Sequence, residues 1–79
     1  MSAEVVEQIV ESVEAALPGA RVEVRAASPG HFEVRVVSTL FEGESRVAQH
    51  QRVYAAITHL MKGDGAPVHA IDRLECVLP

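Results

Sequence analysis

The stretch that decides the fold is RVEVRAASPGHFEVRVVS, residues 21–38. Apolar and charged residues alternate over residues 21–26 and again over residues 31–38, and this period of two is typical of half-buried strands. Between them, residues 28–30 (Ser-Pro-Gly) have the composition of a tight turn. The stretch therefore predicts an antiparallel hairpin.

Two stretches with helical periodicity flank this hairpin. Over residues 3–17, apolar side chains recur on one helix face, so we expect a helix that Ser2 caps and that residues 18–19 (Pro-Gly) end. A second helical region runs from Ser45, the expected N-cap, to Lys62, either as one helix or as a short turn followed by a longer helix. Its expected apolar face consists of Val47, His50, Val53, Tyr54, Ile57, Leu60 and Met61.

Residues 68–77 are rich in Val, Ile and Leu and predict a third strand, although Ile71 and Asp72 interrupt its alternation. Because the connection from the second strand passes through the helical region, we expect the second and third strands to pair in parallel. The predicted fold is α+β in the order α-β-β-α-α-β, with a three-stranded mixed sheet and the helices on one face. Residues 1–79 are expected to form a single small domain.

Composition limits the classes of function. The 79 residues carry a net charge of −4, are 48% hydrophobic and include one cysteine, Cys76. These values fit a folded domain, and the acidic balance disfavours electrostatically driven binding of nucleic acid. A lone cysteine forms no intramolecular disulfide, and no apolar run approaches the ~20 residues of a membrane span. We therefore expect a cytoplasmic protein that does not bind membranes.

The chemically active side chains do not indicate catalysis. The sequence contains no Gly-x-Ser-x-Gly elbow and no Cys-His pair at a recognisable spacing, and Cys76 fits a small buried hydrophobe. Residues 63–65 (Gly-Asp-Gly) lack the pattern of a phosphate loop and fit a helix end followed by a loop. We expect a protein that is not an enzyme.

Four histidines are more than packing requires in so short a chain, and imidazole is a good ligand for borderline metals. His50 and His59 are nine positions apart on roughly opposite helix faces, so we expect a structural and a solvated histidine, respectively. His31 and His69 lie at the starts of two strands, and parallel pairing would place both at the same end of the sheet. This leaves two alternatives open, a metal site or ordinary histidines at strand ends.

The string His-Phe-x-Val-x-Val-Val-Ser-x-x-Phe-x-Gly-x-Ser-x-Val-x-x-His-x-x-Val-Tyr, residues 31–54, is followed by Val-His-Ala-Ile at residues 68–71. Together they resemble the BolA family from the start of the string to the end of the chain. Residues 40–47, with Gln51 and the Val-Tyr of residues 53–54, are most similar to the IbaG or YrbA branch. The resemblance implies a fold similar to the type II KH domain, in the order of elements predicted above.

BolA-family proteins pair with monothiol glutaredoxins, and the resemblance implies that this chain shares a glutathione-linked [2Fe-2S] cluster with such a partner. Iron–sulfur cluster trafficking, or iron and stress regulation, would be its role. The family's principal ligand is the histidine of the Val-His-Ala motif, here His69. A second ligand comes from the loop before the second strand, where Ser28 replaces the cysteine of one branch and leaves His31 as the candidate. A homodimer through the same surface stays open.

The resemblance also offers an alternative, a nucleic-acid-binding transcriptional regulator that uses the family's helix-turn-helix-like region. Its candidate residues are Arg46, His50, Arg52 and Lys62. Glutamines flank His50 where the stress-morphogen branch has arginines, and no Gly-x-x-Gly clamp is present. Three positively charged side chains spread over the helix would neutralise few phosphates of a nucleic acid, which weakens this alternative.

Three more positions in the string are expected to be structural. Phe41 and Tyr54 are two of only three aromatic residues, so we expect both to anchor the core, with the Tyr54 hydroxyl free to lie at the surface. Gly43 is expected to adopt a backbone conformation that a side chain would oppose.

Overall fold

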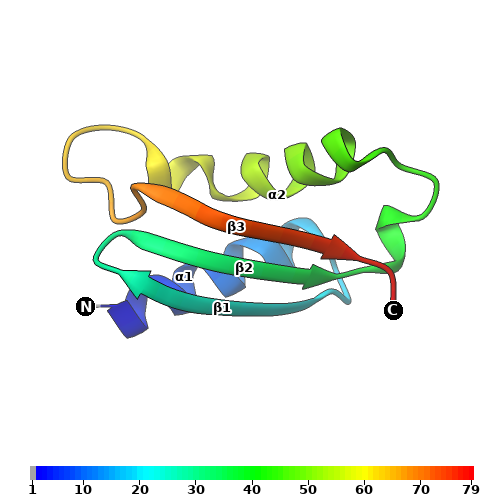
Figure 1. Cartoon of the computed structure of the whole chain (residues 1–79), viewed down its shortest axis with the longest axis horizontal. Helices are drawn as coiled ribbons and strands as arrows, with labels where there is room; N and C mark the ends of the chain where they lie inside the picture. Colours follow the sequence, from blue (N-terminus) through cyan, green and yellow to red (C-terminus); the bar gives the residue numbers. More distant parts are fainter. Residues whose placement is uncertain (1) are drawn as a thin grey trace.

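The computed structural model describes residues 2–79, which form two α-helices, a short 3-10 turn and three strands. The elements are α1 (Ser2–Ala16), β1 (Arg21–Ser28), β2 (His31–Val37), η1 (Thr39–Phe41), α2 (Arg46–Met61) and β3 (Ala70–Val77). Both helices lie on one face of the sheet (Figure 1). The α+β fold with a three-stranded mixed sheet is therefore confirmed.

The strands lie in the order β1-β2-β3, and both predicted pairings are present. The hairpin of β1 and β2 is antiparallel and pairs Arg21 with Val37 at its open end. β2 and β3 run in parallel, with Val36 beside Cys76. Gly30 closes the hairpin turn at a φ of +78°, a conformation that glycine adopts at little cost.

One irregularity divides β3 and accounts for its broken alternation. Phe32 pairs with Ile71 and Glu33 pairs with Arg73, so Asp72 is an extra residue without a partner in β2. Such a bulge changes which face the following residues occupy. Beyond it, Leu74 and Cys76 again pack against the core.

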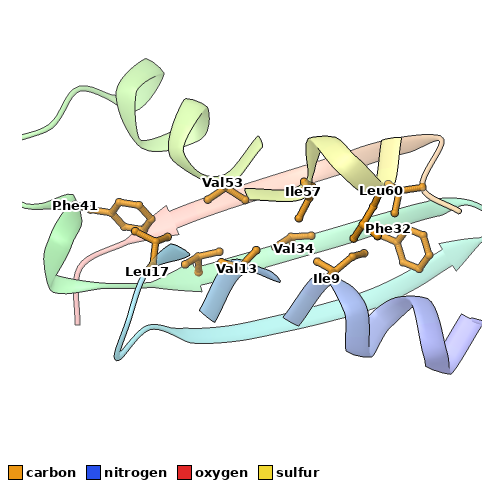
Figure 2. Close-up of a cluster of buried hydrophobic side chains, with 11 residues drawn as sticks. Ile9, Val13, Leu17, Phe32, Val34, Phe41, Val53, Ile57 and Leu60 are labelled. Carbon is orange, nitrogen blue, oxygen red and sulfur yellow. The ribbon is translucent and has the colours of Figure 1, made fainter. Parts of the chain in front are cut away.

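The core is a single hydrophobic cluster between the sheet and the helices (Figure 2). Its buried members are Ile9, Val13, Leu17, Phe32, Val34, Val36, Phe41, Val53, Ile57, Leu60 and Val68. Burying a side chain of this kind contributes roughly 1.5–3 kcal/mol. The other face of the sheet carries exposed ion pairs such as Arg25–Glu33, at 2.8 Å, which contribute much less to stability.

One expectation about the helices is wrong, and one open alternative is resolved. Ser2 lies inside α1 instead of capping it. The second helical region is one continuous α-helix, and the additional helical element before it is the three-residue turn η1. The Ser45 cap is confirmed, because its Oγ accepts a hydrogen bond from the Ala48 N–H at 3.1 Å.

The predicted apolar face of α2 is too wide. Val53, Ile57 and Leu60 are buried, whereas Val47 is 66% exposed and Tyr54 is 37% exposed. Successive helical residues are about 100° apart, so Tyr54 turns away from the core beside Val53, and Val47 projects from a different side of the helix. Tyr54 is therefore not a core anchor, while Phe41 is fully buried as expected.

The third strand begins at Ala70, two residues later than predicted, because the backbone N–H groups of Val68 and His69 donate hydrogen bonds outside the pairing of β2 with β3. The Val68 N–H donates to the Leu60 carbonyl at 3.1 Å, and the His69 N–H donates to the Gly30 carbonyl at 2.8 Å. These bonds tie the connection to the end of α2 and to the hairpin turn. No helix among residues 2–79 is both long and apolar enough to cross a membrane.

Candidate metal centre

His31 and His69 meet at one end of the sheet. His31 is the first residue of β2, and His69 directly precedes β3. Their ring centroids lie 6.5 Å apart, with the ring planes at 81° to each other. The parallel pairing of β2 with β3 produces this approach, as their positions in the sequence predict. A ligand role for either ring stays a prediction.

The His69 ring lies against the backbone of the hairpin turn. A Cβ added at Gly30 would lie 2.6 Å from the His69 Nδ1 and 2.8 Å from its Cγ, which is closer than atoms can pack. The Gly30 carbonyl also accepts hydrogen bonds from the backbone N–H groups of His69 and Ala70. Gly30 therefore both allows and holds the position of this ring.

The His31 ring is held by a carboxylate that the sequence analysis did not identify as a site residue. The His31 Nδ1 lies 3.0 Å from Oδ1 of Asp72, the bulged residue of β3. The sequence signal was present, because Asp72 interrupts the alternation of the third strand. Its direction toward His31 depends on the strand register, which the sequence pattern does not give.

At this site the chain offers two imidazole rings, those of His31 and His69, as candidate metal ligands. Across residues 2–79, no group of three or more His, Cys, Asp or Glu side chains is arranged to hold a metal ion. A shallow depression beside His69 is lined mainly by apolar groups from the N-terminal part of α1, the hairpin turn and the loop before β3. The arrangement suits ligation completed by a second molecule.

Cys76 lies near the opposite end of β3 and takes no part in the histidine pair. Partial burial disfavours its thiolate and raises the pKa of Cys76 to about 11. At neutral pH the side chain is a thiol packed against the core, in agreement with the expectation of a small hydrophobe.

The other two histidines lie apart from this site. His59 is exposed on α2, with its Nε2 3.3 Å from Oγ of Ser12 on α1. His50 is half-buried in a groove between α2 and β3 that Arg46 and Cys76 also line.

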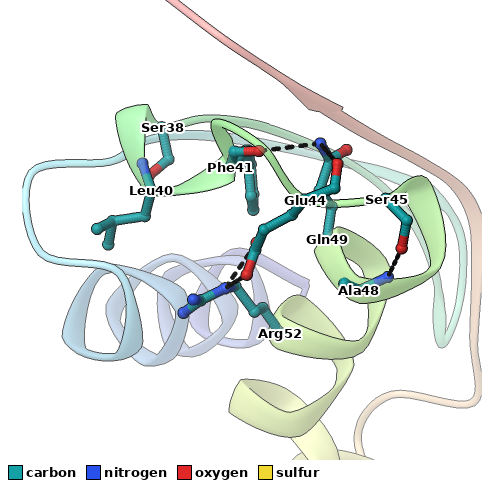
Figure 3. A network of polar contacts seen from close by, with 8 residues as sticks. All are labelled: Ser38, Leu40, Phe41, Glu44, Ser45, Ala48, Gln49 and Arg52. Carbon is teal, nitrogen blue, oxygen red and sulfur yellow. Dashed lines mark hydrogen bonds and ion pairs between the residues drawn. The ribbon is translucent and has the colours of Figure 1, made fainter.

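The middle of the BolA-like string, residues 41–52, forms a network of hydrogen bonds and one ion pair at the start of α2 (Figure 3). The Gln49 side-chain amide donates to the carbonyls of Phe41 and Glu44, at 3.3 and 3.1 Å. The Arg52 Nε lies 2.8 Å from both carboxylate oxygens of Glu44. Gly43 has a φ of +79°, a backbone conformation that residues with a side chain rarely adopt, and this agrees with the expectation for this glycine. This part of the string therefore has a structural role.

The candidate nucleic-acid residues do not form one basic patch. Arg52 is paired with Glu44, and Arg46 shares its groove with Glu75. Lys62 follows the last turn of α2, about 24 Å from Arg46 at the rise of an α-helix. Arg46 and His50 line the same groove.

Comparison with known proteins gives a consistent match. A family model described as "BolA-like protein" matches residues 1–76. The chain is 38% identical over 66 residues to an "uncharacterized protein in rpoN-murA intergenic region" of Acinetobacter guillouiae, covering 82% of this chain and 75% of that protein. It is 44% identical over 48 residues to mouse BolA-like protein 1, covering 61% of this chain but only 33% of that relative.

Solved structures agree with the sequence comparisons. A BolA protein homologue from Coxiella burnetii superposes with a TM-score of 0.73 at 30% identity, over 90% of this chain and 86% of that one. The solution structure of BolA1 from Mus musculus superposes with a TM-score of 0.75 at 33% identity, over 95% of this chain and 65% of that one.

Proposed function

The chain belongs to the BolA-like protein family, and on that premise we propose that it is a non-catalytic adaptor that shares a [2Fe-2S] cluster with a monothiol glutaredoxin and glutathione. The observation that carries the proposal is the convergence of His31 and His69. Trafficking of the cluster, or a regulatory response to iron and stress, is the role we propose for the complex. The narrower IbaG or YrbA branch, the KH-like comparison and a cytoplasmic location stay predictions.

The donor chemistry supports a shared cluster. Iron–sulfur clusters need about four ligands, and histidine replaces cysteine on one iron of Rieske centres. His31 and His69 supply two nitrogen donors, so a partner would contribute the remaining sulfur ligands. Cys76, which lies near the other end of β3 and is protonated at neutral pH, is not one of them.

The residues around the pair prepare it for ligation. The Gly30 turn positions the His69 ring at the surface, where a partner can reach it. The His31 ring is half-exposed and lies 6.5 Å from the His69 ring, measured between ring centroids, so both rings are accessible at the same end of the sheet. The cluster itself would supply an exchangeable iron–sulfur unit, while this chain supplies ligands and a docking surface.

The proposal is tested by adding the protein to glutathione-loaded, cluster-bound monothiol glutaredoxin and following visible circular dichroism. We expect a new spectrum at one-to-one stoichiometry, its loss with His69→Ala and its weakening with His31→Ala. His59→Ala, which removes an exposed histidine on α2, is the matched control and should behave as the wild type. An unchanged spectrum with the wild-type protein would contradict the proposal.

The nucleic-acid alternative has less support from the side chains. The pairing of Arg52 with Glu44 and the separation of Lys62 from Arg46 leave little concentrated positive charge. Protein–phosphate contacts of this kind weaken steeply with salt. Salt-resistant binding of DNA that Arg46→Ala abolishes would reverse this preference.

A further inference from the structure

The bulge in β3 directs a carboxylate at one of the two candidate ligands. Asp72 is the extra residue between Ile71 and Arg73, and its Oδ1 lies 3.0 Å from Nδ1 of His31. Bulges interrupt strand pairing and often re-aim a side chain next to a functional site. Without the bulge, Asp72 would occupy a regular position in the ladder with β2.

Stability does not explain this contact. The side chains of His31 and Asp72 are 41% and 43% exposed, and ion pairs with such exposure contribute about 0–1 kcal/mol. The contact does determine the proton position on the ring. A carboxylate only accepts hydrogen bonds, so the His31 Nδ1–H is the donor, and in the neutral ring Nε2 keeps its lone pair.

We propose that Asp72 is a positioning residue, which holds His31 in the Nδ1–H tautomer and thereby makes Nε2 its ligand atom. This inference rests on the proposed function, because it assigns the geometry of the same site. Metal-bound histidines commonly donate their second N–H to a carboxylate, which fixes the tautomer and the ring orientation. Within residues 2–79, this is the one side-chain hydrogen bond found for the His31 ring.

The tautomer is measured on the protein without any cluster, by long-range ¹H–¹⁵N correlation of the imidazole nitrogens at about pH 8, where a free imidazole is neutral. In the wild type we expect His31 in the Nδ1–H form. Asp72→Ala should return the ring to a mixture of tautomers. Asp64→Ala, which removes the chain's other aspartate from an exposed loop, is the control of equal charge and should leave His31 unchanged.

The second readout is the rate at which the complex with cluster-bound glutaredoxin loses its visible spectrum. Loss of an outer carboxylate typically weakens metal binding 10- to 100-fold. We therefore expect about 10-fold faster loss for Asp72→Ala, with Asp64→Ala at the wild-type rate.

The outcomes separate this inference from the proposed function. If the His31 tautomer is the same in the wild type and in Asp72→Ala, or if the two lose the cluster equally fast, the inference is wrong while the shared cluster stands. If the wild type itself takes up no cluster, the proposed function fails, and the ligand assignment fails with it. A changed tautomer together with faster cluster loss supports both.

Discussion

At the scale of single residues, a comparison of Gly30 with Gly65 separates two roles of glycine in this chain. One is to adopt a backbone conformation with positive φ, and the other is to leave space for a neighbouring side chain. Gly30 and Gly65 both have positive φ, at +78° and +79°, but only at Gly30 would a Cβ meet the His69 ring. Alanine at Gly65 should lower the free energy of unfolding by about 1 kcal/mol, because L-residues oppose this backbone conformation. Alanine at Gly30 should lower it further, because the added Cβ also clashes with the His69 ring. Only Gly30→Ala should also displace His69.

The measurement for this pair is chemical denaturation together with the circular dichroism titration against cluster-bound glutaredoxin. We expect a lower denaturation midpoint for Gly30→Ala than for Gly65→Ala, and, under conditions where both variants are folded, weakened cluster uptake for Gly30→Ala alone. Equal cluster uptake by the two variants would show that the Gly30 contact does not position His69.

Cys76 gives a second prediction at this scale, which concerns pH. Burial raises the folded-state pKa of Cys76 to about 11, above the ~8.5 of a free thiol. The folded state therefore holds its proton at pH values where the unfolded state has lost it. The stabilising contribution is complete below about pH 8.5 and is lost as the pH rises toward 11.

The check is the pH dependence of unfolding, compared between the wild type and Cys76→Ala so that other titrating groups cancel. The wild type should lose more stability between pH 8.5 and 11, and its thiol should react with iodoacetamide slowly at pH 8 unless the protein is unfolded. Fast alkylation of the folded protein would contradict the assignment of a protected thiol.

The sequence allowed the two candidate ligands to be placed, but not the contacts that position them. His31 and His69 could be placed at one end of the sheet, because parallel pairing brings the starts of two strands together. The contacts of Gly30 and Asp72 with these rings could not, because they depend on where the turn closes and on a one-residue shift in strand register.

At the scale of elements, the start of α2 is fixed by its cap and by the network of hydrogen bonds around it. The Ser45 Oγ accepts the Ala48 N–H, satisfying one of the backbone donors left free at a helix start. Ser45→Ala should cost about 1 kcal/mol of stability, measured by urea denaturation. Ser45→Asp, which retains an acceptor, should lose much less, and equal losses would argue against a capping role.

The strands were easier to predict than the helix faces. A period of two survives in residues 21–38 because one sheet face contacts the core and the other carries charges. α2 is less regular, since Val47 and Tyr54 are apolar but exposed. Its position over the sheet is decided by tertiary packing, which periodicity along one helix does not contain.

At the scale of the whole molecule, one core joins every element, so truncation at its centre should destabilise the entire fold. Ile57 is fully buried and Val47 is 66% exposed, although both lie on α2 and both were predicted to face the core. Ile57→Ala should lower the free energy of unfolding by about 2–5 kcal/mol. Val47→Ala should stay within about 0.5 kcal/mol of the wild type.

Thermal and urea denaturation of the two variants test this contrast. A large loss with Val47→Ala would mean that the exposed side of α2 is packed in solution. The fold places the core between the helices and the sheet, and it leaves the histidine pair at one end, where ligation need not disturb packing.

The central claim is that two histidines of this chain ligate the shared cluster, and pulsed electron paramagnetic resonance tests it most directly. This chain is labelled with ¹⁵N-histidine, mixed with unlabelled cluster-bound glutaredoxin and glutathione, and reduced by one electron. We predict two strongly coupled ¹⁵N nuclei in the wild type and one in His31→Ala. A reduced cluster without strongly coupled ¹⁵N in the wild type would contradict the account.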